Sequence, residues 1–159
     1  MPVNTALSMK VSGYLRPQNI NLALKQTEKK AALREVAEVL KSSGCVTDFE
    51  AFFNEILERE RISNTALGHE VALPHARTDQ CNDIVMAVGR YEHGVDFGAQ
   101  DQLAVKFIIL IGTPKKMVTD YLRLVGALAR LMKQDSFRAS LLSCKTPEEF
   151  IETFKRAEG

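Results

Sequence analysis

Residues 59–79, with the sequence RERISNTALGHEVALPHARTD, hold the pattern from which the rest of the chain can be interpreted. Pro74 has a fixed backbone φ angle, and its ring disfavours the helical conformation for Leu73. The backbone that enters His75 is therefore stiff and extended, which predicts an imidazole held in one direction. A fixed imidazole suits nucleophilic or acid–base chemistry. The simpler interpretation of a lone Pro-His pair is a strand end with a solvated histidine.

Upstream of this stretch, the sequence predicts one strand and two helices. Residues 19–24 alternate between polar and apolar, as in a half-buried strand, and residues 27–42 begin with a threonine cap and carry apolar side chains on one helical face. Thr47 and Glu50 have the spacing of a capping box, in which each side chain bonds an N–H at the start of a helix. The phenylalanine, isoleucine and leucine residues that follow form one apolar stripe, which predicts a helix that ends near Glu60.

Downstream, the sequence predicts three extended segments and then three helices. The extended segments are residues 70–73, 84–90 and 103–111, and the last of these (LAVKFIILI) has the continuous apolar composition of a buried strand. Residues 118–133 are apolar on most sides, which predicts a deeply packed helix. A short helix over residues 135–143 follows, and Thr146-Pro147 supplies the cap and the first-turn proline of a closing helix.

This order of elements is typical of an α/β domain in which helices cover both faces of one small sheet. With 159 residues, one domain over residues 1–159 is expected. The formal net charge of +1 and the lack of a basic stripe disfavour nucleic-acid binding. No apolar run approaches the roughly 20 residues that span a bilayer, and the N-terminus does not have the pattern of a signal peptide. A cytoplasmic protein without membrane insertion is therefore expected.

A metal site and a cysteine nucleophile are both disfavoured. A zinc site would use His69, Glu70, His75 and His93. However, His69 and His75 are six residues apart on an extended run, which puts their Cα atoms about 20 Å apart. A Cys–His pair has no support, because nothing marks any of the three scattered cysteines as activated. No metal is therefore predicted.

Phosphoryl transfer through His75 would use residue types that the stretch does contain. A neutral imidazole nitrogen attacks phosphorus when a hydrogen bond holds the other ring nitrogen. The three phosphoryl oxygens then need donors, and the nearby donors are Arg59, Ser63, Thr65 and the backbone around Gly68. No cofactor is required, because the phosphoryl donor would itself be an activated phosphohistidine.

These residues also form a pattern that is found in one family. The pattern consists of Arg59-Glu60, Ser63, Thr65, Gly68 and above all VALPHAR at residues 71–77. With it, the sequence resembles the enzyme IIA domains of the sugar phosphotransferase system, of the fructose/mannitol type that includes a nitrogen-regulatory branch. The resemblance covers about residues 11–159. It implies a three-layer α/β/α sandwich, in which helices flank a small mixed β-sheet.

The resemblance also implies a function. His75 would accept a phosphoryl group from the phosphocarrier protein HPr or its nitrogen-branch counterpart, and Arg59 would be the active-site arginine. His75 would then pass the group to an enzyme IIB, or hold it as a regulatory mark for a target protein. The alternative is a non-catalytic regulatory protein that binds partners through the same face, with slow or vestigial phosphorylation.

Two positions depart from the family pattern. A glycine-rich loop, approximately Gly-x-Gly-x-Gly, usually precedes the motif, whereas residues 66–70 retain only Gly68. Many members also have a second active-site histidine at the start of the long helix after the last strand, where this chain has Tyr121. A tyrosine hydroxyl donates a hydrogen bond but carries no positive charge near neutral pH. Tyr121 is therefore predicted to bind phosphate without the proton-linked charge of a histidine.

Overall fold

The computed structural model describes residues 10–159. Residues 1–9, which belong to the N-terminal segment expected not to be a signal peptide, lie outside the described part. Two short 3₁₀ helices open the described chain, η2 (Val11–Tyr14) and η3 (Pro17–Asn19). Within residues 10–159, no helix has the length and apolar character needed to cross a membrane.

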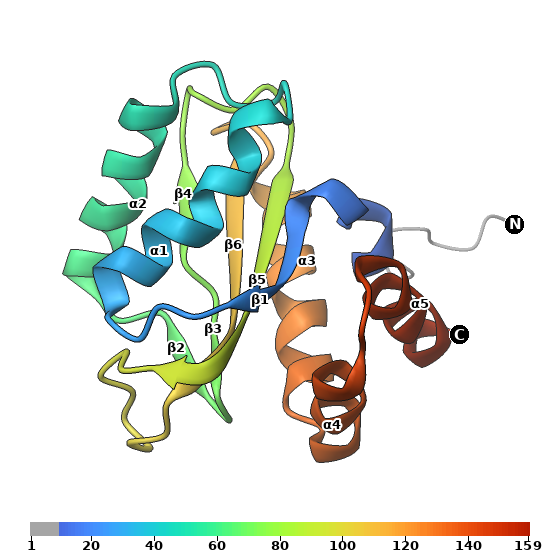
Figure 1. Cartoon of the computed structure of the whole chain (residues 1–159). Helices are drawn as coiled ribbons and strands as arrows, with labels where there is room; N and C mark the ends of the chain where they lie inside the picture. Colours follow the sequence, from blue (N-terminus) through green and yellow to red (C-terminus); the bar gives the residue numbers. More distant parts are fainter. Residues whose placement is uncertain (1–9) are drawn as a thin grey trace, which may run out of the picture.

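A mixed sheet of six strands forms the centre of the fold (Figure 1). Its strands are β1 (Ile20–Leu24), β2 (Ala66–Gly68), β3 (Val71–Ala72), β4 (His75–Arg77), β5 (Val85–Val95) and β6 (Val105–Thr113). The long strands β5 and β6 are antiparallel neighbours in the middle of the sheet. β1 runs parallel to β5 on one side, and β3 and β4 run parallel to β6 on the other. β2 is antiparallel to β3 at the edge, so the expected mixed sheet is confirmed.

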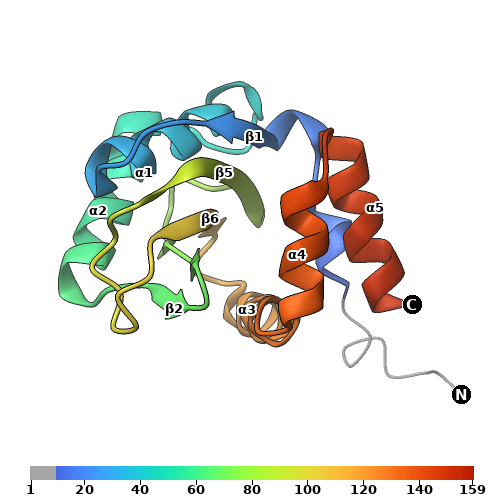
Figure 2. The same ribbon diagram turned by 60° about the horizontal axis from the view of Figure 1, so that its bottom comes forward.

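Helices cover both faces of this sheet, as the sequence predicted. The helices are α1 (Lys29–Glu38, continued by the 3₁₀ turn η4, Val39–Ser42), α2 (Phe49–Ile62), α3 (Val118–Met132), α4 (Asp135–Ser143) and α5 (Pro147–Glu158). Figure 2 shows α1 and α2 on one side of the strands and α3, α4 and α5 on the other. β6 supplies Ile108 and Leu110 to the core between the sheet and α1 and α2, and Phe107, Ile109 and Ile111 to the core between the sheet and α3, α4 and α5. This alternation is why a strand buried on both faces reads as a continuous apolar run.

Two helices are capped by residues other than those predicted. Glu28, and not the preceding threonine, caps α1, because its carboxylate accepts from the N–H groups of the first turn. Asp48 caps α2 by accepting from the N–H of Ala51 at 3.1 Å. The predicted capping box of Thr47 and Glu50 is therefore wrong, since the Thr47 hydroxyl instead bonds a glutamine side chain at 2.9 Å. The predicted cap of the closing helix is confirmed: the Thr146 hydroxyl accepts from a backbone N–H at 3.1 Å.

Two other expectations needed correction. Of the segment predicted to be extended at residues 70–73, only Val71–Ala72 is a strand, β3, and it forms a hairpin with the unpredicted strand β2. The helix predicted to be deeply packed, α3, buries only one face, and Leu122 is 61% exposed on its other side. α3 packs on one face of the sheet and leaves its outer side to solvent, so its apolar residues are not all in the core.

Candidate functional site around His75

His75 lies in a pocket of about 500 Å³ formed by three separate elements. It is the first residue of β4 and pairs with Ile111, near the C-terminal end of β6. The last turns of α2 form one wall and the start of α3 contributes another. The residues that line the pocket are Glu55, Glu58, Arg59, Ile62, His75, Ala76, Arg77 and Tyr121.

The His75 ring is held in one direction, as the Leu-Pro-His sequence predicts. Leu73 and Pro74 are buried, and the Pro74 carbonyl accepts from the N–H of Ile111 at 2.9 Å, which fixes the backbone against β6. His75 Nδ1 lies 3.0 Å from the carbonyl oxygen of Leu73. A carbonyl can only accept, so Nδ1 carries the proton. In the neutral ring, Nε2 therefore keeps a free lone pair.

The surroundings of His75 favour this neutral form. Burial is the main cause that lowers its pKa below the ordinary value of 6.5, and the positive charge of Arg59 acts in the same direction. The bond to the Leu73 carbonyl and the charge of Glu60 act in the opposite direction. Because the net effect is a lowered pKa, the ring is mostly neutral at pH 7, which is the state that a nucleophilic imidazole requires.

Two arginines line the pocket, together with two carboxylates that have partners of their own: Glu58 pairs with Arg61, and Glu55 accepts from the Thr78 hydroxyl. Arg59 is in the last turn of α2, where its Nη1 donates to the carbonyl of Ser63 at 2.9 Å and so fixes one end of the guanidinium. Arg77 stands two residues after His75 on β4, on the same face of the strand. Burial raises the pKa of Tyr121, and the charges of both guanidinium groups act in the opposite direction with a smaller effect. Together the two arginines make the pocket a candidate site for an anion.

Tyr121 lies next to His75, as predicted. It is in the first turns of α3 and is buried, and its ring centroid is 5.3 Å from that of His75, with the planes tilted by 45°. α3 starts at Val118, so the positive end of its dipole is also near this end of the sheet. The structure therefore brings together Arg59, His75 and Tyr121 from three separate parts of the chain.

The three other predicted phosphate-binding residues are not among those that line the pocket. Ser63 ends α2 and offers its carbonyl to Arg59. Thr65 is buried and donates its hydroxyl to Glu60. Gly68 lies in the β2–β3 hairpin with a φ of +83°, where an added Cβ would be 3.1 Å from an Asp101 oxygen. In this structure Ser63 and Thr65 therefore bond side chains of α2, and none of the three residues lines the pocket.

Arg77 has a place in the pocket that the sequence analysis did not assign. It belongs to the quoted motif, but no role was given to it. The missing signal was the strand itself: in extended backbone, residues i and i+2 point to the same face. Had residues 75–77 been recognised as a strand, Arg77 would have been predicted beside His75.

The other histidines lie apart from this site. His69 is exposed in the β2–β3 hairpin, and His93 is exposed on β5. In the part of the chain that the structure describes, no group of three or more histidine, cysteine or acidic residues is placed to hold a metal ion.

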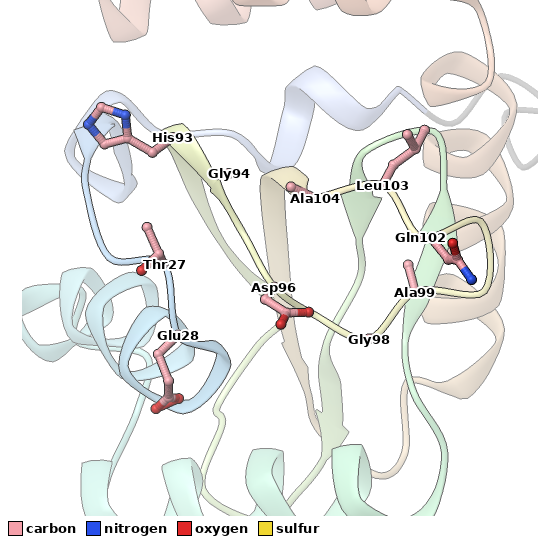
Figure 3. Close-up of a pocket in the computed structure, with 10 residues that line it drawn as sticks. All are labelled: Thr27, Glu28, His93, Gly94, Asp96, Gly98, Ala99, Gln102, Leu103 and Ala104. Carbon is pink, nitrogen blue, oxygen red and sulfur yellow. The ribbon is translucent and has the colours of Figure 1, made fainter.

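A second and larger cavity, of about 780 Å³, lies at the opposite end of β6 (Figure 3). It is near Val105, six residues and about 20 Å along β6 from the partner of His75. Figure 3 shows the polar ends of Glu28, His93 and Gln102 pointing in different directions. A ligand site needs polar groups that converge on one point, so the His75 pocket is the stronger candidate.

Comparison with known proteins identifies the family. A family model described as "Phosphoenolpyruvate-dependent sugar phosphotransferase system, EIIA 2" matches residues 13–157. The chain is 28% identical to the fructose-specific EIIABC component of Bacillus subtilis over 91% of its own length, but it spans only 23% of that protein. It is 30% identical to a nitrogen regulatory protein of Bradyrhizobium diazoefficiens, over 84% of this chain and 86% of the relative.

A solved structure agrees with this assignment. The nitrogen regulatory protein IIA-Ntr of Neisseria meningitidis superposes with a TM-score of 0.85 and 26% identity, covering 91% of this chain and 98% of the other. The fold, the family model and the relatives all point to the same assignment. The chain therefore belongs to the EIIA 2 family of the phosphoenolpyruvate-dependent sugar phosphotransferase system.

Proposed function

We propose that the protein is a cytoplasmic phosphohistidine carrier, which accepts a phosphoryl group from an HPr-type phosphocarrier on Nε2 of His75. One observation carries this proposal: the bond of Nδ1 to the Leu73 carbonyl leaves Nε2 as the nucleophilic nitrogen. The lowered pKa of His75 supports it, because an imidazolium has no lone pair with which to attack.

The transfer is an in-line displacement between two imidazoles. The Nε2 lone pair of His75 attacks the phosphorus of the donor's phosphohistidine and forms a new N–P bond. The donor's N–P bond breaks, and its electron pair returns to the donor imidazole. The proton on His75 Nδ1 stays in place, and the Leu73 carbonyl stabilises the positive charge that develops on the ring.

The arginines and Tyr121 act on the phosphoryl oxygens. Arg59 and Arg77 line the pocket and offer forked donors to a group whose charge is spread over three oxygens. The Tyr121 ring is beside His75, and its hydroxyl offers a neutral donor. Neutral tyrosine in place of a second histidine removes a proton-linked charge from the site, so transfer should vary less with pH.

From His75 the phosphoryl group passes to an enzyme IIB, or marks the protein for a regulated partner. The name of the Bacillus relative, EIIABC, joins an A component to B and C components, which supports the first destination. The Bradyrhizobium relative is named a nitrogen regulatory protein, which supports the second. A purely regulatory protein with slow phosphorylation is the alternative, and Tyr121 in place of the second histidine is the observation that favours it.

Transfer from radiolabelled phosphoenolpyruvate through enzyme I and HPr tests the proposal. Wild-type protein should become labelled within the time of the assay, and His75→Gln should stay unlabelled. His93→Gln is the matched control, because His93 is exposed on β5 at the far end of the sheet and should leave labelling unchanged. Absence of label on the wild-type protein, or label on the His75→Gln variant, would rule out the proposed carrier role. Wild-type labelling far slower than HPr turnover would favour the regulatory alternative.

A further inference from the structure

Glu60, which follows Arg59 in the last turn of α2, is a buried carboxylate with no part in the proposed transfer. Its side chain is 4% exposed, and Lys29 at the start of α1 places its Nζ 3.0 Å from Oε2. Thr65 donates its backbone N–H to Oε2 at 2.8 Å and its hydroxyl to Oε1. A charge removed from water is tolerated only with such partners, so these three bonds fix the Glu60 side chain.

Lys29 is itself held in position. Its Nζ lies 4.4 Å from the ring centroid of Phe97, which is buried, so the ammonium group also makes a cation–π contact. Asn64, in the loop after α2, donates its side-chain N–H to the carbonyls of Phe97 and Gly98 at 2.7 and 3.2 Å. The start of α1 and the loop after α2 therefore both contact the segment 97–98.

The same set of contacts extends to His75. The carbonyl of Thr65 accepts from the N–H of Leu73 at 3.1 Å, and the carbonyl of Leu73 is the group that orients His75 Nδ1 at 3.0 Å. Glu60 is thus connected to both Arg59 and His75. It adjoins Arg59 through the chain, and it reaches His75 through Thr65 and Leu73.

We propose that Glu60 is a positioning residue that fixes Arg59 relative to His75, and that Lys29 and Thr65 act through it. The inference rests on the proposed function for its catalytic meaning. A guanidinium must be held within about 0.5 Å of its productive position, and a misplacement of about 1 Å costs on the order of a hundredfold in rate. A flexible helix end would not meet this demand, whereas a buried carboxylate with three partners does.

Two variants remove different contacts of the Glu60 carboxylate. Glu60→Gln keeps the shape, but its single acceptor oxygen cannot serve both Thr65 donors and Lys29. Lys29→Gln removes the ion pair and leaves both Thr65 bonds in place, and Lys29→Arg restores the charge. Glu50→Gln is the matched control, because the Arg34–Glu50 pair, at 2.6 Å, joins the same two helices at the opposite end of α2.

Two readouts do not depend on phosphoryl transfer. Relaxation of the Arg59 ¹⁵Nε reports the order of its side chain, and the ¹⁵N shifts of the His75 ring report which nitrogen carries the proton. We expect the Arg59 side chain to be less ordered in Glu60→Gln and Lys29→Gln than in the wild type. In Glu50→Gln and Lys29→Arg we expect its order to equal that of the wild type. Circular dichroism selects variants that remain folded.

The third readout is the rate of acceptance from phospho-HPr and from phosphoramidate, a small phosphoryl donor. At saturating donor, we expect the rate to fall by about ten- to a hundredfold in Glu60→Gln and less in Lys29→Gln, with the apparent KM for the donor nearly unchanged. Wild-type rates in both folded variants would overturn the inference.

The outcome separates this inference from the proposed function. If wild-type protein accepts no phosphoryl group from either donor, the proposed function fails, and the order of Arg59 alone decides whether Glu60 positions it. If Glu60→Gln does not fold, Lys29→Gln decides. Unchanged order of Arg59 in a folded variant that has lost the ion pair would overturn the positioning role in every case.

Discussion

Replacing Arg59 with lysine separates a phosphate-binding role from a purely structural one. Arg59 is in the last turn of α2, where any cation complements the helix dipole. Its guanidinium donates through Nη1 to the Ser63 carbonyl and has further donors to offer to the pocket. A lysine ammonium is a compact point charge, and it cannot reach both the carbonyl and two phosphoryl oxygens in the fixed geometry of the fork.

The expected loss follows from the number of bonds that change. A hydrogen bond to a charged group contributes about 1.5–3 kcal/mol. Losing one such bond in the transition state therefore lowers the transfer rate by about 10- to 150-fold, at 1.36 kcal/mol for each factor of ten. Folding should change much less, by at most about 1 kcal/mol, because the Ser63 bond is exposed.

Single-turnover transfer from phospho-HPr measures the rate, and thermal unfolding measures the stability. Arg61→Lys is the matched control, since Arg61 lies in the same helical turn but is not among the residues that line the pocket, and a lysine keeps the charge that pairs with Glu58. It should transfer at the wild-type rate. If Arg59→Lys also transfers at that rate, Arg59 serves only the helix end and the reasoning is refuted.

Three further predictions concern other parts of the molecule. Tyr121→Phe should slow acceptance by about 2- to 13-fold, as expected for one neutral hydrogen bond of about 0.5–1.5 kcal/mol, and an unchanged rate would limit Tyr121 to packing. ¹⁵N titration should give His75 a pKa below 6.5. The folded protein then binds the His75 proton less tightly than the unfolded chain does, so the free energy of unfolding should fall as the pH drops from about 6.5 toward the lowered pKa. His75→Gln should remove that part of the decline, and the same pH profile in both proteins would contradict the prediction. Gly112→Ala should destabilise by about 1–3 kcal/mol, because its Cβ would lie 2.7 Å from a buried cysteine sulfur, whereas Gly13→Ala has nothing within 4 Å and should be nearly neutral; equal melting temperatures would refute this.

The sequence was most informative where one residue type has one physical consequence. Pro74 predicted an extended, fixed approach to His75, and the structure confirms it: the Pro74 carbonyl accepts from the N–H of Ile111, and the Leu73 carbonyl bonds the His75 ring. The apolar stripe of α2 predicted its extent to within two residues. The position of Tyr121 beside His75 came from the family resemblance, since no local pattern links residues 46 apart in the chain.

Choices between equivalent neighbours could not be predicted locally. Thr47 and Asp48 are both good caps, and the contact of Thr47 with Gln80, 33 residues away, decides between them. The β2–β3 hairpin turns at His69 and Glu70, with φ angles of 57° and 69°. These residues are not the asparagine and glycine that usually mark such a turn, so the local sequence predicted neither the hairpin nor strand β2.

In the candidate site, too, contacts between distant residues could not be predicted from the local sequence. Thr65 has the chemistry of a phosphate ligand, and its hydroxyl was assigned to that role from residue type alone. In the folded chain the buried carboxylate of Glu60 takes this hydroxyl. That carboxylate is buried, and it is paired with Lys29, 31 residues earlier. A contact between such distant positions has no signature in local sequence.

The most direct test of the central claim is a ³¹P–¹⁵N correlation spectrum of the phosphorylated protein with ¹⁵N-labelled histidines. The hydrogen bond from Nδ1 to the Leu73 carbonyl predicts coupling of phosphorus to Nε2 of His75, with Nδ1 still protonated. Coupling to Nδ1 of His75, or to a nitrogen of any other histidine, would contradict the account.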